Sequence, residues 1–397
     1  MIRSDLITNK HYDVVIVGAG AMGMSSGYYL SEKGLKVLMI DAYDPPHDNG
    51  SHGGDTRLIR HAVGEGLHYI PLALRSQEMW NELQNHSEDE IFRETGILNF
   101  GYKGSEFLGN TIEGAREYGL EIETLTQEEI LERWPDMQGE DLDIGYYEEK
   151  GGVIMGGNAI RTYRRLALQN GAELLIDTPV KSIHPEDDKV TVQTEHDTFT
   201  GDQLILSAGG WTGTFLKDLG LDLKLQPSRR TIAWFEADES LYSSDNFPGF
   251  IGRSRKGAYY GFPSIDGTGV KIGRFNGDPE DDDEPENMDK TFGAFEKDEG
   301  HLRDFLDEYM KEANGKLNRG VTCIFSNTPD EDFIIDRHPE HENIFIAGGF
   351  SGHGFKYVPV IGEIFTQLIT EGKTEHDISE FSVTRDILYE KKHSAKL

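Results

Sequence analysis

The beginning of the chain alternates apolar runs with a glycine-rich segment. Residues 12–17 (YDVVIV) form a nearly continuous apolar run, which is typical of a buried parallel strand. The small and apolar residues after Gly18 predict a helix, and Gly34 stands where its left-handed C-terminal residue is expected. A second apolar run at residues 36–40 predicts another parallel strand, which ends at Asp41. The pattern therefore predicts a β-α-β unit at the start of the chain.

Further apolar runs predict that the same sheet continues much later in the chain. Residues 203–208 (QLILSA) and 343–347 (NIFIA) have the pattern of buried strands, and each run is followed by glycine. Residues 174–183 and 189–193 show the alternation of half-buried strands. The blocks between them carry charged helices and aromatic strands, so we expect a second domain inserted twice. The predicted division assigns residues 1–84, 152–215 and 321–397 to a doubly wound α/β nucleotide-binding domain, and residues 85–151 and 216–320 to a second domain.

Composition excludes several classes of protein. The 397 residues include 71 acidic and 39 basic side chains, and the formal net charge of −32 argues against binding to nucleic acids or anionic membranes. No stretch approaches the ~18 consecutive apolar residues of a membrane span, and the N-terminus lacks the apolar core of an export signal. Cys323 is the single cysteine, as fits a reducing compartment. We expect a cytoplasmic protein without a metal site, and we interpret the acidic segment 278–289 as a solvated loop.

The glycines after the first strand carry the first candidate chemistry. Gly18 permits a tight turn, Gly20 lets the backbone approach a pyrophosphate, and Gly23 allows the helix to pack closely on the strand. Asp41, at the end of the second strand, is spaced to accept hydrogen bonds from ribose hydroxyls. Together these features predict a site for NAD or FAD, and they do not choose between the two.

A second glycine-rich segment precedes the last predicted helix. Val358, Ile361 and Phe365 fall on one face of this helix, and Gly372 follows its end. The preceding residues 351–356 (SGHGFK) place glycine backbone at a helix N-terminus, which stabilises anionic groups. We expect this segment to form part of the cofactor site.

Four longer motifs give the sequence a family resemblance. They are GSHGGDTRLIRHAVGEG from Gly50, YYGFPS from Tyr259, TCIFSNTPDEDFIID from Thr322 and GGFSGHGFK from Gly348. With these motifs the chain resembles, over nearly its whole length, the flavoprotein family of the monomeric sarcosine oxidases and N-methyltryptophan oxidases. The resemblance implies an FAD domain joined to a catalytic α+β domain built on an antiparallel sheet. It also implies oxidation of the secondary amines of amino acids by O2 and water, which gives an amino acid, formaldehyde and hydrogen peroxide.

The resemblance also implies roles for individual residues. Cys323 matches the cysteine to which the family attaches FAD, through a thioether to the 8α-methyl carbon of the flavin. Arg60 and Lys356 match the pair that holds the substrate carboxylate. Lys271 matches the lysine that activates oxygen beside the flavin.

Other positions follow or depart from the family pattern. Arg57 matches an arginine on the flavin face, and Tyr260 matches a tyrosine of the substrate cavity. Gly53 and Phe275 stand where the family commonly has histidines, and Phe325 stands where it has a tyrosine. These changes remove polar groups from the expected substrate wall, so the family pattern does not determine which amine is the substrate. The expected FAD contacts are Gly18, Gly20, Gly23, Asp41, Ser51, His52, Arg57, Val180, Cys323, Gly352, Gly354 and Lys356.

Three alternatives stay open beside the oxidation of sarcosine or N-methyltryptophan. An apolar wall of Phe275 and Phe325 also fits an oxidase of a bulkier or cyclic amine, such as a fructosyl amino acid or pipecolate. An FAD dehydrogenase that passes electrons to a protein or quinone is a second alternative, against which Lys271 argues. An NAD-binding module without chemistry is the third, and the motifs from Gly50 and Gly348 argue against it. The expected partners are a small amine and O2, and the expected protein is a monomer.

Overall fold

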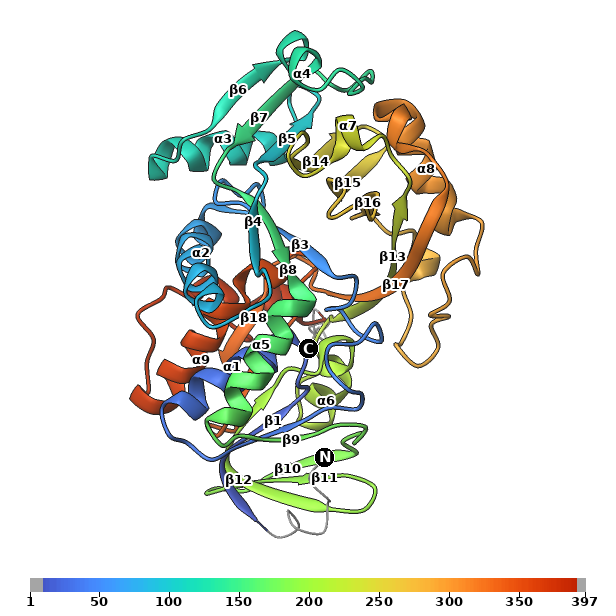
Figure 1. Ribbon diagram of the computed structural model, residues 1–397. Helices are drawn as coiled ribbons and strands as arrows, with labels where there is room; N and C mark the ends of the chain where they lie inside the picture. The colour runs from blue at the N-terminus through green and yellow to red at the C-terminus, as the bar shows by residue number, and fades with distance from the viewer. Residues whose placement is uncertain (1–9, 391–397) are drawn as a thin grey trace, which may run out of the picture.

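The computed structural model describes residues 10–390, in which a mainly parallel sheet lies below a mainly antiparallel one (Figure 1). The helices are α1 (Ala21–Glu32), α2 (Ile70–Gln84), α3 (Glu106–Tyr118), α4 (Gln127–Arg133), α5 (Gly156–Gln169), α6 (Thr212–Asp218), α7 (Glu239–Tyr242), α8 (Lys297–Tyr309) and α9 (Val358–Glu371). Among the helices of this part of the chain, none is both long and apolar enough to cross a bilayer.

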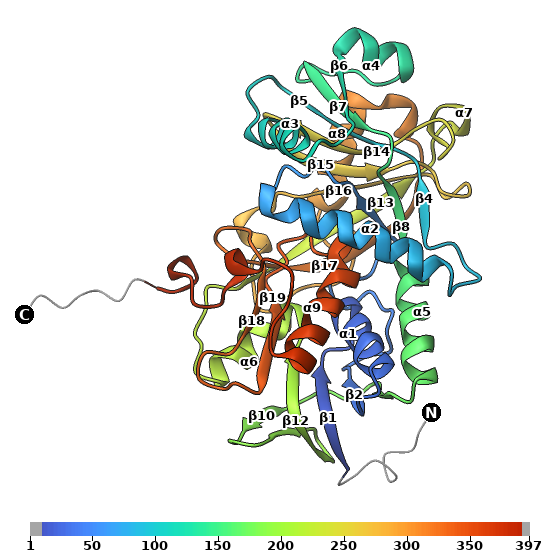
Figure 2. The same cartoon turned by 90° about the vertical axis from the view of Figure 1, so that its left-hand side faces the viewer.

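The lower sheet contains the predicted nucleotide-binding strands. Its strands are β1 (His11–Val17), β2 (Val37–Ile40), β9 (Glu173–Leu175), β10 (Ser182–Pro185), β11 (Val190–Gln193), β12 (Thr198–Leu206), β18 (Ile334–Arg337) and β19 (Ile344–Gly348). They run in the order β10-β11-β12-β1-β2-β9, and β19 pairs in parallel with the second half of β12. Helices α1, α5 and α9 cover one face, and α6 packs on the other (Figures 1 and 2). The predicted doubly wound α/β class is confirmed, because the apolar strands are buried on both faces.

One predicted strand was wrong. Residues 174–183 do not form a single strand, because β9 ends at Leu175 and pairs with β2, whereas β10 begins at Ser182 and pairs with β11 on the opposite side of the sheet. Asp177 has a positive φ of 51°, and Pro179, which has no backbone N–H to donate, follows it. The alternation of apolar residues continues across this break, so the pattern alone could not locate it.

The upper sheet provides the predicted antiparallel platform. Its order is β17-β13-β16-β15-β14-β5-β7-β6, and all neighbours are antiparallel except β14 and β5. The strands are β5 (Ile97–Gly101), β6 (Glu123–Thr126), β7 (Ile144–Glu148), β13 (Gln226–Phe235), β14 (Gly249–Ser254), β15 (Gly257–Phe262), β16 (Val270–Arg274) and β17 (Leu317–Asn327). A small antiparallel sheet lies between the two large ones and contains β3 (Thr56–Ile59), β4 (Phe92–Glu94) and β8 (Gly152–Met155).

The proposed division into domains stays a prediction. Strand β17 belongs entirely to the upper sheet, and it crosses the predicted boundary between residues 320 and 321. Its register with β13 pairs Cys323 with Arg230, so the cysteine is held by the upper sheet. Cys323 therefore belongs to the upper sheet and not to the sheet that carries the glycine turn.

Candidate active site

A cavity of about 910 Å³ collects most of the residues predicted from the sequence. The predicted residues that line it are Gly18, Gly20, Asp41, Ser51, His52, Arg57, Arg60, Val180, Tyr260, Phe275, Cys323, Phe325, Gly352, Gly354 and Lys356. Gly23 and Lys271 are the two predicted site residues that do not line it. The cavity lies where the carboxyl ends of the parallel strands face the upper sheet, which is the usual ligand position in open α/β sheets.

The turn between β1 and α1 fits a dinucleotide. Gly18 has a positive φ of 93°, and a Cβ atom there would lie 2.4 Å from the carbonyl oxygen of Ser207. A Cβ atom at Gly23 would lie 2.1 Å from the carbonyl oxygen of Gly18, so α1 packs against the turn as only glycine permits. The turn and the start of α1 thus bring bare backbone to the cavity, as a pyrophosphate requires.

The end of β2 fits the ribose of the same ligand. Asp41 is buried, and its Oδ1 accepts hydrogen bonds from the Tyr43 backbone N–H (2.9 Å) and from His47 Nε2 (3.3 Å). Within residues 10–390, no group donates to Asp41 Oδ2. Val180, in the segment that interrupts the predicted strand, also lines the cavity. These residues could hold the adenosine part of FAD.

Arg57 organises the loop that closes this part of the cavity. Its guanidinium donates to the carbonyl oxygens of Ser51 (3.0 Å), Gly53 (2.5 Å) and Thr56 (2.7 Å). Ser51 in turn donates to the carbonyl oxygen of Ile324, beside Cys323. The loop is therefore fastened to the upper sheet next to the cysteine.

His52 of the same loop is neutral. Burial lowers its pKa to about 3, and His47 and Arg57 contribute to the shift. Its Nε2 accepts a hydrogen bond from the His47 backbone N–H at 3.1 Å. A Cβ atom at Gly20 would lie 3.1 Å from His52 Nδ1, so this ring lies close to the glycine turn.

The family histidine at position 53 would not fit this loop. A Cβ atom at Gly53 would lie 2.4 Å from Asp48 Oδ1 and 2.8 Å from Asp48 Cα. Asp48 accepts a hydrogen bond from the Gly54 backbone N–H (3.1 Å) and forms an ion pair with Arg319 (3.2 Å). The departure at Gly53 is thus explained by the position of Asp48.

Cys323 is a buried free thiol on the cavity side of β17. Burial raises the pKa of this thiol, while Arg57, Arg230 and Lys271 oppose the rise. The net effect raises the pKa, so the thiol stays protonated, and the three basic side chains only reduce the cost of forming the thiolate, which is the nucleophilic form.

Arg60 and Lys356 enclose a carboxylate of the protein itself. Arg60 Nη2 donates to both oxygens of Glu65, at 2.6 and 2.8 Å, and Lys356 Nζ lies 3.6 Å from Glu65 Oε1. The side chains of all three residues are at most 9% exposed. Burial would raise the pKa of Glu65, but Arg60 and Lys356 hold it well below its usual range. The two residues predicted to bind a carboxylate therefore do so within the structure.

Glu65 was missed by the sequence analysis. It lies inside the motif from Gly50, but an acidic residue in a glycine-rich loop gives no sign of facing a cation.

Burial lowers the pKa of Lys356 to about 7, although Glu65 opposes the shift. Lys356 Nζ also donates to the carbonyl oxygen of His353 at 3.0 Å.

Lys271 lies behind the cavity wall. Its Nζ donates to the carbonyl oxygens of Gly54 (2.5 Å) and Thr56 (2.8 Å) and to Thr56 Oγ1 (3.0 Å). Burial lowers its pKa well below the usual range, and Arg57 adds to this shift. The neighbouring Arg57 and the burial both disfavour its protonated form, and its role in oxygen activation stays a prediction.

The expected substrate wall is aromatic. The rings of Tyr260 and Phe275 pack with centroids 4.7 Å apart, and both line the cavity. Burial raises the pKa of Tyr260, so its hydroxyl stays protonated. Phe325 packs against Gly352, where a Cβ atom would lie 2.2 Å from the ring. Arg60 and Lys356 line the same cavity as these three aromatic residues.

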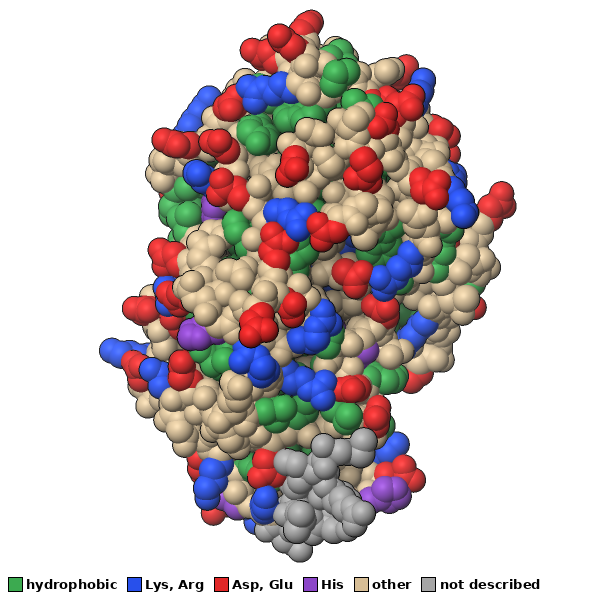
Figure 3. All heavy atoms as spheres, viewed as in Figure 1, with side chains coloured by type: hydrophobic (Ala, Val, Ile, Leu, Met, Phe, Trp, Pro, Cys, Tyr) green, Lys and Arg blue, Asp and Glu red, His purple; other side chains and the backbone are tan. Residues whose placement is uncertain are grey.

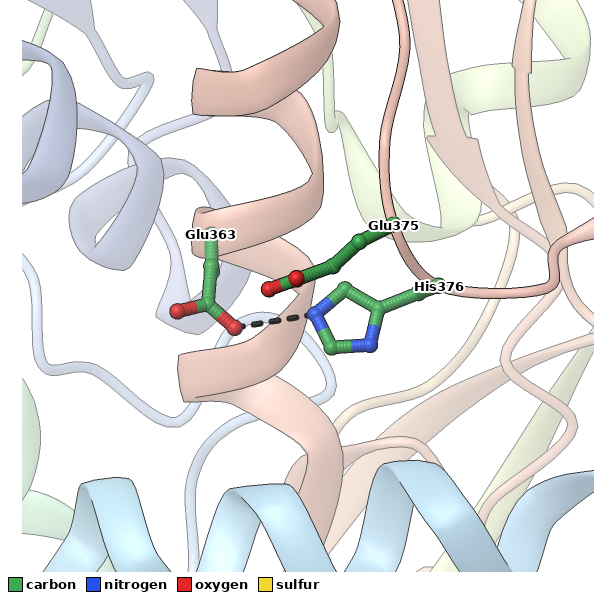
Figure 4. Close-up of side chains that lie close together, drawn as sticks. All are labelled: Glu363, Glu375 and His376. Atoms are coloured by element: carbon green, nitrogen blue, oxygen red, sulfur yellow. Dashed lines mark hydrogen bonds and ion pairs between the residues drawn. The ribbon is translucent and has the colours of Figure 1, made fainter.

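A cluster with the chemistry of metal ligands lies elsewhere in the chain (Figure 4). Glu363 on α9 and Glu375 and His376 after it offer ligand atoms within 4.8 Å of one another. Glu363 already accepts hydrogen bonds from His376 Nε2 (2.9 Å) and from Arg75 Nε (3.1 Å) and Nη2 (2.8 Å). Burial would raise the pKa of Glu363, but His376 and Arg75 lower it to about 2. We interpret the cluster as an ion-pair network that fastens the segment after α9 to this helix.

Fold and cavity together define the class of protein. A glycine turn, a buried acid at the end of the second strand and a cation-lined compartment under an antiparallel sheet are the parts expected of an FAD-dependent oxidoreductase. The profile of the FAD dependent oxidoreductase family (DAO) matches residues 13–368. The chain therefore belongs to the FAD-dependent oxidoreductase family, and specifically to its branch of monomeric sarcosine oxidases and N-methyl-L-tryptophan oxidases.

Two relatives and one solved structure support this assignment. The chain is 49% identical to the monomeric sarcosine oxidase of Bacillus sp. (strain B-0618) over 384 residues, which cover 96% of this chain and 98% of the relative. It is 40% identical to the N-methyl-L-tryptophan oxidase of Salmonella heidelberg (strain SL476) over 375 residues, 94% of this chain and 99% of the relative. The open form of NikD, an amino acid oxidase essential for nikkomycin biosynthesis, shares the fold with a TM-score of 0.81 at 22% identity, over 94% of this chain and 98% of that one. The family predicted from the four motifs is confirmed.

Proposed function

We propose that this oxidoreductase oxidises the secondary amine of an amino acid, such as sarcosine or an N-methyl amino acid. The buried group of Arg60, Lys356 and Glu65 carries this proposal, because two basic residues that line the same cavity as the glycine turn and Cys323 already pair with a carboxylate. The names of the relatives, which are oxidases of sarcosine and N-methyl-L-tryptophan, agree with it.

The chain's own residues bind and orient the substrate. Arg60 can grip a carboxylate with two N–H groups, and Lys356 adds a second charge, so together they fix the amino acid by one end. Glu65 competes with the substrate for Arg60, because both of its oxygens accept from Arg60 Nη2, whereas Arg60 Nε is buried without a partner. The rings of Tyr260 and Phe275 then exclude water around the amine.

The reaction needs a neutral amine. An ammonium has no lone pair to stabilise the iminium that develops when the neighbouring carbon loses a hydride equivalent. The chemistry that bound FAD would supply is acceptance of this electron pair and its transfer to O2. For an N-methyl amino acid the balanced overall reaction consumes O2 and water and yields the amino acid, formaldehyde and hydrogen peroxide.

The proposal includes three further features of the protein. Cys323 would carry the flavin as a thioether, which its burial, its position in the cavity and its surrounding cations support. Lys271 would favour O2 as the electron acceptor by placing positive charge near the flavin. The protein would act as a cytoplasmic monomer, in keeping with its single cysteine and high negative charge.

The products test the proposal directly. Purified protein is incubated in air with sarcosine or N-methyl-L-tryptophan, and O2 uptake, hydrogen peroxide and formaldehyde are measured. We expect equal amounts of all three. Reduction of an artificial acceptor without O2 uptake would instead indicate a dehydrogenase. If neither substrate reacts, the same assay is repeated with a fructosyl amino acid and with pipecolate.

The covalent attachment has a separate test. Wild-type protein precipitated with acid should retain its yellow colour in the pellet. The Cys323→Ala variant should release FAD into the supernatant, whereas a colourless wild-type pellet would exclude the thioether.

A further inference from the structure

Arg253 is a basic residue on the face of the upper sheet that carries the cavity-lining residues. It lies on β14 two residues after Ile251, and alternate residues of a strand point to the same face. Ile251 lines the cavity, and it pairs with Tyr260, which also lines the cavity. Arg253 therefore lies on the same face of the sheet as Ile251, next to the cavity. It is not itself one of the lining residues.

The guanidinium of Arg253 is held by aromatic rings. Its Cζ atom lies 3.9 Å from the centre of the Phe107 ring and 5.3 Å from the centre of the Phe275 ring. Phe275 lines the cavity, and Arg60 lies over the same Phe107 ring at 5.5 Å. The Phe107 ring also packs against Gly64, next to Glu65, where a Cβ atom would lie 2.6 Å from it. Arg253 and Arg60 thus both contact Phe107, which places Arg253 near the carboxylate-binding group.

Arg253 lacks the partner that a buried cation normally has. Within residues 10–390, no carboxylate lies within 4.0 Å of its guanidinium, and its Nε is buried without a hydrogen-bond partner. Arg229, by contrast, pairs with Asp298 at 2.6 Å in the same sheet. The chain contains 71 acidic and 39 basic residues, so the missing partner does not reflect a shortage of carboxylates. Burying part of a cation without a counter-ion is costly, and a ligand carboxylate would supply the missing charge compensation.

We propose that the substrate carries a second carboxylate and that Arg253 binds it. Arg60 and Lys356 would hold the α-carboxylate, and Arg253 would receive the side-chain carboxylate at the outer end of the aromatic wall. The substrate class is then an N-substituted acidic amino acid, for which N-methylglutamate is a suitable probe. This inference rests on the proposed function and narrows its substrate.

The test compares a charged side chain with its neutral isostere. The value of kcat/KM is measured for N-methyl-L-glutamate and N-methyl-L-glutamine with the wild type and with Arg253→Gln, Arg253→Lys and Arg255→Gln. The wild type should prefer the glutamate by at least about tenfold. Arg253→Gln should lose this preference through a higher KM, and Arg253→Lys should keep part of it. Arg255→Gln removes an exposed charge two residues away and should retain the preference.

Binding gives a readout that needs no turnover. Calorimetric titration with glutarate and with glutaramate, its half-amide, should show tighter binding of glutarate by the wild type and equal binding by Arg253→Gln. If this difference appears while no secondary amine is oxidised, the proposed oxidation fails and the role of Arg253 stands. Equal binding of both compounds by the wild type would overturn the inference. An equal fall in kcat/KM for both substrates in Arg253→Gln would also overturn the inference. Arg253 would then act on the whole site, for example as an alternative partner for Glu65.

Discussion

At the scale of single residues, the site is governed by charges that are buried in pairs. Glu65 forms ion pairs with both Arg60 and Lys356 and offsets part of their positive charge. A substrate carboxylate must compete with this internal carboxylate. Substrate affinity therefore depends on the difference in free energy between the ion pairs that Arg60 and Lys356 form with the substrate and those that they form with Glu65.

The first prediction concerns Glu65→Gln. Removing the competing charge should tighten the binding of a simple carboxylate such as acetate by about tenfold, as measured by the change in flavin absorbance on titration. The same change should lower the melting temperature without ligand, because breaking a buried pair costs about 3 kcal/mol. Glu78→Gln, which alters an exposed residue of α2, should change neither property. An unchanged affinity for acetate would show that Glu65 does not compete.

The second prediction is a pH dependence from Lys356. Burial lowers its pKa to about 7, and Arg60 and Glu65 are the charged groups that face it. A bound carboxylate favours the protonated amine, so the affinity for acetate should be highest at low pH and should fall as the pH rises through about 7. Lys356→Arg stays protonated throughout this range and should bind acetate with little pH dependence. The same decline in both proteins would assign the titration to another group.

At the scale of elements, local patterns predicted the nucleotide-binding parts and failed where distant segments meet. The strands at 12–17 and 36–40 and the turn at Gly18 follow from local apolar runs and glycine spacing, which act within one β-α-β unit. The order of the upper sheet joins residues 97–101 with 249–254, and no local pattern encodes such a pairing. The position of Lys271 behind the loop at 54–56 likewise depends on packing between separate segments.

The third prediction tests the contact between α1 and β1. In Gly23→Ala the new Cβ would lie 2.1 Å from the Gly18 carbonyl oxygen, so α1 must move away from the turn. We expect a lower melting temperature and at least about a tenfold loss in affinity for FAD added to apoprotein. Gly109→Ala places a Cβ in open space within α3 and should raise stability by up to about 1 kcal/mol. Full FAD affinity in Gly23→Ala would mean that this close contact is not required.

At the scale of the whole molecule, negative charge lies outside and the functional cations lie inside. Acidic side chains are spread over the face shown in Figure 3, with Lys and Arg side chains between them. The net charge of −32 causes self-repulsion that destabilises the compact state and opposes association. The cations around Cys323 and Glu65 are enclosed, so salt should screen them much less than the surface.

The fourth prediction follows from this self-repulsion. Raising NaCl from 10 mM to 0.5 M shortens the Debye length to a few ångströms and should increase the melting temperature by about 2 °C or more. KCl should have the same effect, because screening depends on ionic strength. A fall in melting temperature would show that favourable surface ion pairs outweigh the repulsion.

The central claim is that a flavin in this cavity is reduced by a secondary amine that Arg60 and Lys356 hold by its carboxylate. The most direct measurement is the flavin absorbance of purified protein mixed anaerobically with sarcosine, N-methyl-L-tryptophan, N-methyl-L-glutamate and dimethylamine. We expect a yellow protein that one or more of the amino acids bleach, that dimethylamine leaves unchanged, and whose bleaching at low substrate concentration slows by at least about a hundredfold in Arg60→Met. A flavin that no secondary amino acid bleaches, or that dimethylamine bleaches equally well, would contradict the account.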